Sequence, residues 1–136
     1  MRRVFVDTSA FVAARNKRDP DNERARGALG DLVSRGVRLF TSNFVFAETH
    51  AALLVRTGRD QALQWGSALR ASDAIELVRI EPEIEEEAWR ILESHADKSW
   101  SYVDASSFAL MEQEGVTEAF SFDRDFAQRG LKVVPG

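Results

Sequence analysis

The sequence contains no cysteine, which excludes disulfide bonds, thiolate ligands for zinc or an iron–sulfur cluster, and a cysteine nucleophile. It also lacks any apolar run close to the roughly 20 residues that a membrane-spanning helix needs. The short apolar stretch after Arg2 and Arg3 stops at Asp7, which is too early for a secretory signal. We therefore expect a cytoplasmic protein with no membrane partner.

The remaining composition is that of an ordinary globular chain. Its 136 residues are 44% hydrophobic and 29% charged, so we expect one domain over residues 1–136 rather than disorder. The net charge of −4 is unevenly spread: residues 1–70 carry 12 Lys and Arg against 7 Asp and Glu, whereas residues 71–136 carry 6 against 15. The basic half is either a surface that contacts phosphate groups or ordinary solvated surface, and charge alone does not separate the two.

Apolar runs of strand length alternate with segments of helical periodicity along the whole chain. The predicted strands cover residues 3–6, 37–41, 75–80, 119–122 and 131–134. The predicted helices cover residues 10–14, 21–35, 44–56, 61–71, 82–94, 104–114 and a short turn at 123–127. This alternation predicts an α/β fold, a three-layer α/β/α sandwich with a central, mostly parallel sheet. Gly27 and Gly30 are expected to weaken the second helix.

Three aspartates stand at the ends of predicted strands or the starts of predicted helices. Asp7 ends the first strand, Asp123 ends a later one with Asp125 two residues on, and Asp104 opens a helix. Each is equally suited to cap a helix. If the sheet is parallel, however, the carboxyl ends of its strands share one edge, where such folds bind ligands.

Glu48 is harder to explain as surface. Its helix places Phe44, Ala51 and Val55 at same-face spacings, so Glu48 is expected on the apolar, inward stripe. Glutamate is almost never buried without a partner. We therefore expect it to join the three aspartates in one pocket, where a divalent cation would relieve their mutual repulsion. Oxygen ligands of this kind suit Mg²⁺ or Mn²⁺.

Four ordered segments resemble the PIN-domain family, and specifically the VapC-type toxins of bacterial toxin–antitoxin pairs. These segments are Phe5-Val6-Asp7-Thr8-Ser9-Ala10, Thr41-Ser42-Asn43 through Glu48, Ser101-Tyr102-Val103-Asp104-Ala105-Ser106-Ser107-Phe108, and Ala119-Phe120-Ser121-Phe122-Asp123-Arg124-Asp125-Phe126. The resemblance implies a metal-dependent endoribonuclease that uses Mg²⁺ or Mn²⁺, with a VapB-like antitoxin as partner and a homodimeric state. The catalytic and metal-binding residues that it implies are Asp7, Glu48, Asp104 and Asp123, supported by Thr8, Ser42, Ser121 and the further acid Asp125.

Histidine chemistry offers little alternative to a metal. A metal-free ribonuclease generally needs histidine as general acid and base, and the chain has only His50 and His95, both expected to be structural or solvated. For the RNA strand, the loop residues Arg15, Lys17 and Arg18 are candidate phosphate contacts, or else a solvated loop. The segment from Trp100 to Tyr102 is the best candidate for stacking on bases, although such residues more often belong to a core.

Three other functions compete with this hypothesis. A haloacid-dehalogenase-like phosphatase needs a second Asp two residues after the first, and Ser9 stands there. A phospho-accepting receiver domain needs an acidic pair before the first helix and a lysine after a late strand, whereas Lys132 lies inside the last predicted strand. A catalytically silent PIN-like module that binds RNA or protein remains the open alternative.

Overall fold

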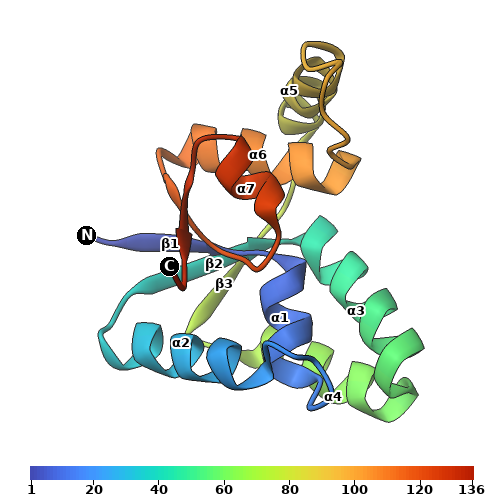
Figure 1. Ribbon diagram of the computed structural model, residues 1–136, viewed down its shortest axis with the longest axis vertical. Helices are drawn as coiled ribbons and strands as arrows, with labels where there is room; N and C mark the ends of the chain where they lie inside the picture. The colour runs from blue at the N-terminus through green and yellow to red at the C-terminus, as the bar shows by residue number, and fades with distance from the viewer.

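The computed structural model describes residues 1–136 as five strands and seven helices (Figure 1). The strands are β1 (Arg3–Val6), β2 (Arg38–Ser42), β3 (Ile75–Val78), β4 (Glu118–Phe120) and β5 (Lys132–Val134). The helices are α1 (Thr8–Arg15), α2 (Asn22–Ser34), α3 (Asn43–Thr57), α4 (Arg59–Ala71), α5 (Pro82–Glu93), α6 (Tyr102–Glu114) and α7 (Arg124–Gln128). None of these helices combines the length and apolar character that crossing a membrane requires.

The strands form one sheet in the order β3-β2-β1-β4-β5, and every neighbouring pair is parallel. The chain leaves the central strand β1 on one side, towards β2, and returns on its other side as β4. In open parallel sheets, such a reversal leaves a crevice outside the carboxyl ends of the strands. Side chains that directly follow β1 and β4 are therefore placed at this crevice.

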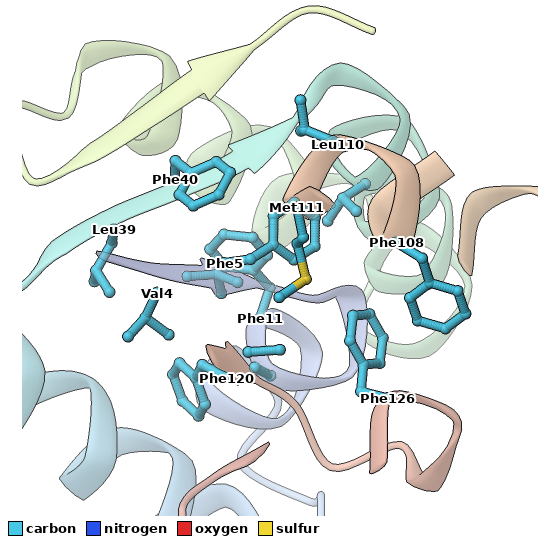
Figure 2. Close-up of a cluster of buried hydrophobic side chains, with 14 of the residues drawn as sticks. Val4, Phe5, Phe11, Leu39, Phe40, Phe108, Leu110, Met111, Phe120 and Phe126 are labelled. Carbon is cyan, nitrogen blue, oxygen red and sulfur yellow. The ribbon is translucent and has the colours of Figure 1, made fainter. Parts of the chain in front are cut away.

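Helices cover both faces of the sheet. In Figure 1, α6 and α7 lie on one side of the sheet, and α1, α2 and α4 lie on the other. Residues 4–6 of β1 are fully buried, as expected for a central strand covered on both faces. Aromatic rings fill the space beside this strand (Figure 2): the ring centroids of Phe5 and Phe126 are 6.3 Å apart, and those of Phe108 and Phe126 are 5.1 Å apart.

Helix α6 is buried on nearly all sides, because it packs between the sheet and α5. Residues 104–111 are all buried, and the hydroxyls of Ser106 and Ser107 donate to the Val103 carbonyl at 2.7 and 3.0 Å. The helix ends at Gly115, whose positive φ of 68° is accessible to glycine at little cost. The buried run begins at Asp104, in the first turn of the helix.

The predicted three-layer α/β/α architecture is confirmed, and the sheet is parallel throughout rather than mostly so. Strand ends differ by one or two residues, as at β3, which stops at Val78. The weakening expected at Gly27 and Gly30 stays a prediction, since α2 runs over both without a break, and a methyl group at either glycine would meet no atom within 4 Å. Both glycines face open space, while the buried Ala25 and Leu32 anchor the helix.

The apolar face of α3 was assigned wrongly from the sequence. Its buried residues are Val45, Thr49 and Leu53, whereas the stripe that carries Glu48 faces outward, with Val55 85% exposed. Helix α3 is apolar on both faces, so periodicity alone did not distinguish the core face from the outer one.

This assignment predicts opposite outcomes for neighbouring leucines of α3. Leu53 is fully buried and Leu54 is 45% exposed. We expect Leu53→Ala to lower the free energy of unfolding by about 2–5 kcal/mol, and Leu54→Ala to change it by about 0.5 kcal/mol or less. Urea denaturation of both variants measures this, and equal losses would contradict the assigned face.

Candidate active site

Acidic side chains gather at the carboxyl end of β1. Asp7 directly follows this strand, and its backbone N–H donates to the carbonyl of Phe120 at the end of β4, at 3.0 Å. A cavity of about 420 Å³ opens at this point. Its walls include the four predicted acids, Asp7, Glu48, Asp104 and Asp123.

Two serine hydroxyls hold the buried carboxylate of Asp7. Ser9 donates to Asp7 Oδ2 from its Oγ at 2.8 Å and from its backbone N–H at 3.3 Å, and the Ser121 hydroxyl donates to the same oxygen at 3.0 Å. Through the bond from the Ser9 N–H, Asp7 is also the N-cap of α1. Because all three bonds end on Oδ2, the second oxygen, Oδ1, is available to a ligand.

Asp104 is fixed by a reciprocal cap at the start of α6. Its Oδ2 accepts the backbone N–H of Ser101 at 3.1 Å, while the Ser101 hydroxyl accepts the backbone N–H of Asp104 at 3.0 Å. The sequence placed Asp104 at the opening of this helix, but the cap residue is Ser101, and Asp104 lies in the first turn. Here too, one carboxylate oxygen serves the helix and the other does not.

Asp123 repeats the arrangement at α7, where its Oδ1 accepts the backbone N–H of Asp125 at 3.0 Å. One carboxylate oxygen from each of Asp104, Asp123 and Asp125 lies within 4.8 Å of the other two. Three convergent carboxylates offer the oxygen ligands that a hard divalent ion such as Mg²⁺ or Mn²⁺ prefers. The residues present therefore fit such an ion.

Burial and neighbouring like charges raise the pKa values of the aspartates in this cavity. Burial raises the pKa of Asp7 from 3.8 to about 6, although the bonds from Ser9 and Ser121 oppose the rise. Burial raises the pKa of Asp104 to about 7, assisted by a hydrogen bond with Asp125 and the charges of Asp7 and Asp123. The pKa of Asp123 is raised by burial and by its neighbour Asp125. A bound cation would favour the ionised forms.

The remaining predicted residues take different places. Glu48 lines the cavity from α3 with an exposed side chain, so it reaches the acids from the outer face of the helix. Thr8 also lines the cavity, but its buried hydroxyl has no hydrogen-bond partner, and it is Ser9 that supports Asp7. Ser42 does not line the cavity; its hydroxyl accepts the backbone N–H of Val45 at 3.0 Å and starts α3. It therefore acts on Glu48 only through the helix.

Sequence reasoning missed four residues at the site. One is Ser9, and two are Asp19 and Asp21 of the loop before α2, which line the same cavity. The fourth is Arg56, the only Lys or Arg that lines the cavity. Its spacing was a usable signal, because Arg56 follows Glu48 by eight residues and so lies two turns further along the same face of α3.

The predicted basic residues lie beside the acidic cavity rather than in it. Arg15, Lys17 and Arg18 line a second cavity of about 280 Å³. Arg15 is held there by bonds to the side-chain carbonyls of Gln61 and Gln64, at 3.1 and 3.2 Å. The stacking role considered for Trp100 is contradicted, because this residue is buried.

Trp100 is enclosed by other rings of the core. Its ring centroid lies 5.0 Å from those of both His95 and Phe108. His95 also contacts the Ile91 carbonyl through Nδ1 at 2.7 Å. His95 therefore has a structural role at the end of α5, as expected, and it does not line the acidic cavity.

A family model described as the PIN domain matches residues 4–131. This chain belongs to the PIN domain family. A curated relative is 35% identical over 131 residues, covering 96% of this chain and 97% of the relative; it is named 23S rRNA-specific endonuclease VapC20, from Mycobacterium tuberculosis.

Solved structures share the fold of this PIN domain. The crystal structure of Mycobacterium tuberculosis VapC20, described as a Sarcin-Ricin loop cleaving toxin, has a TM-score of 0.84 at 34% identity and covers 94% of this chain and 95% of its own. VapBC2 from Rickettsia felis, bound to a DNA fragment from its promoter, has a TM-score of 0.71 at 16% identity, with 96% of each chain covered. FitAcB from Neisseria gonorrhoeae has a TM-score of 0.68 at 15% identity, covering 96% of this chain and 95% of its own. The last two show the fold alone.

The raised pKa values predict a pH-dependent gain in stability from Asp104→Asn in the metal-free protein. Below about pH 3 the carboxyl is protonated in both the folded and unfolded chains, so it contributes nothing. Between about pH 3 and 7 the unfolded chain loses this proton first, so the contribution of this carboxyl to the free energy of unfolding falls as pH rises. In EDTA we expect Asp104→Asn to be more stable than wild type at about pH 7.5, by on the order of 2 kcal/mol, and equal to it near pH 3.

Denaturant unfolding at the two pH values measures this difference. Asp73→Asn, at an exposed aspartate outside the cavity, is the matched control and should match wild type at both. Added Mn²⁺ should stabilise the wild type at pH 7.5 more than Asp104→Asn. A variant that is no more stable at pH 7.5 than near pH 3, relative to wild type, contradicts the electrostatic account.

Proposed function

We propose that this protein is a metal-dependent endoribonuclease that hydrolyses RNA phosphodiester bonds, and the toxin of a type II toxin–antitoxin pair. In this proposal residues 1–136 form one nuclease domain that acts in the cytoplasm. The observation that carries it is the cavity at the carboxyl end of β1, whose walls include four acids from distant parts of the chain. A relative at 35% identity that is named an rRNA-specific endonuclease supports the same activity.

Asp7, Glu48, Asp104 and Asp123 are the proposed catalytic and metal-binding residues, and Asp125 joins them because of its place among the convergent carboxylates. Mg²⁺ is the proposed ion, with Mn²⁺ as a substitute. When bound, such an ion lowers the pKa of a coordinated water and offsets negative charge on the phosphate.

The chain's own residues then have distinct tasks. Ser9 and Ser121 keep Asp7 Oδ2 engaged and so orient Oδ1. The Thr8 hydroxyl is buried at the cavity wall and has no hydrogen-bond partner; its proposed role is to turn towards a water or a phosphate oxygen when RNA is bound. Arg15, Lys17 and Arg18 are the proposed contacts to the RNA backbone, since phosphate binding needs cations near a cavity that is itself acidic.

The proposed protein partners are a VapB-like antitoxin and a second copy of this chain. A relative described as a toxin, and the shared fold with VapBC2, support the first. For the homodimer we propose the outer face of α3, where Ala47, Ala51 and Val55 are exposed. Contiguous exposed apolar side chains of this kind mark association surfaces.

Metal-dependent cleavage is the direct test of the nuclease. With labelled structured RNAs, we expect cleavage in Mg²⁺ or Mn²⁺ that EDTA abolishes. Asp7→Asn and Asp104→Asn should each reduce the rate by about 100-fold or more, because each removes an oxygen that would bind the ion. Asp73→Asn should cleave like wild type.

Cleavage that survives EDTA, or that is unchanged in both site variants, would contradict the metal-carboxylate mechanism. If no RNA is cut, although the protein is folded and binds RNA or a protein partner, the catalytically silent module is the better description. Growth arrest on expression of this chain alone, relieved by Asp104→Asn, tests the toxin role separately.

The homodimer is tested by charge insertion on the outer face of α3. Light scattering should give about twice the 15.3 kDa chain mass for wild type, and a value near the chain mass for Val55→Glu, because a buried unpaired carboxylate opposes association. Leu63→Glu, at a 44% exposed leucine of α4, is the control and should remain dimeric. A wild-type monomer, or a dimeric Val55→Glu, excludes this interface.

A further inference from the structure

Beside the acidic cavity lies a second cavity that is almost purely basic. It is formed where the end of α1 and the following loop meet the end of α3 and the start of α4. Four cations line it, Arg15, Lys17, Arg18 and Arg56, together with three neutral polar residues. The lining includes neither an acidic nor an apolar side chain.

The four cations of this cavity form no ion pair within the chain. Eight ion pairs are present in the structure, and none of them involves any of the four cations. Arg15 is positioned by two neutral glutamines, and the backbone N–H of Arg18 bonds to the Asn16 side chain at 3.1 Å, which folds the loop. Neighbouring like charges repel one another, so an anion in the cavity would be bound favourably.

Arg56 connects this cavity to the acidic one. It lines both, and it is the only cation on the wall of the acidic cavity. Glu48, Ala52 and Arg56 follow one another at four-residue intervals along α3, so a single helix face runs from the acids to the basic cavity. A strand whose phosphate lies at the acids can therefore reach the four cations of the basic cavity along this face.

We infer that the cavity lined by Arg15, Lys17, Arg18 and Arg56 is a subsite for the backbone phosphates that flank the scissile bond, with Arg56 holding the nearest of them. This inference rests on the proposed ribonuclease function and names how the strand is held there. Arg56 is a positioning residue: it sets where the strand lies relative to the carboxylates. Because the subsite contacts phosphate alone, it adds affinity without base specificity.

The salt dependence of RNA binding tests this subsite without requiring turnover. In an Asp104→Asn background, we would measure fluorescence anisotropy of a labelled single-stranded RNA of mixed sequence from about 50 to 200 mM KCl. Adding Arg56→Gln should weaken binding several-fold and reduce the slope of log K against log [KCl] by about 0.7, the value for one phosphate contact on a single strand. Arg56→Lys, which keeps the charge, should retain most of the slope.

Arg38→Gln is the matched control, because Arg38 is an exposed arginine at the amino end of β2, on the opposite edge of the sheet. It should leave the slope unchanged, and thermal melting should show that all variants are folded. In the otherwise wild-type chain, Arg56→Gln should raise KM for RNA more than it lowers kcat.

The possible outcomes separate the subsite from the enzyme. An Arg56→Gln slope equal to that of its Asp104→Asn background, or a loss shared by Arg38→Gln, overturns the subsite even if the RNA is cleaved by wild type. A slope reduced only by Arg56→Gln supports the subsite, even if wild type cuts no RNA and the nuclease proposal itself fails.

Discussion

This site depends on aspartates that use one carboxylate oxygen to cap a helix and leave the other oxygen for the cavity. Asp7, Asp104 and Asp123 each give one oxygen to a backbone N–H at the start of a helix. The bond fixes the side chain, and the second oxygen is left for the cavity. Capping a helix and binding a cation are often weighed as alternative roles for an aspartate, but here the first role orients the residue for the second. The cost is a cluster of like charges in a buried place. The raised pKa values of Asp7 and Asp104 mean that their ionised forms are disfavoured in the folded chain.

Much of the fold and part of the site followed from local sequence patterns. Strand and helix periodicities alternate strongly enough to predict a parallel sheet, and the carboxyl ends of parallel strands share an edge. That rule alone brings Asp7 and Asp123 together across more than a hundred residues. Asp104 was also placed at a helix start, although the sequence did not reveal that Ser101 forms the cap and that Asp104 lies within the first turn.

What escaped prediction depends on three-dimensional packing. Helix α3 is apolar on two faces, and only the packing of Val45, Thr49 and Leu53 against the core shows which one is buried. Thr8 and Ser9 offer similar hydroxyls next to Asp7, and the turn of α1 decides that Ser9 makes the bond. Arg56 lines both the acidic and the basic cavity. This position depends on how α3 packs beside the loop after α1, which neither segment indicates alone.

The order of the site residues along the chain has a consequence for folding. Asp7 follows the first strand, whereas Ser121, Asp123 and Asp125 follow β4, more than a hundred residues later. The sheet reaches β1 from its second side only when β4 pairs with it, so the acidic cavity cannot form before these two distant segments meet. Bringing such distant segments together costs more chain entropy than any local contact in this fold.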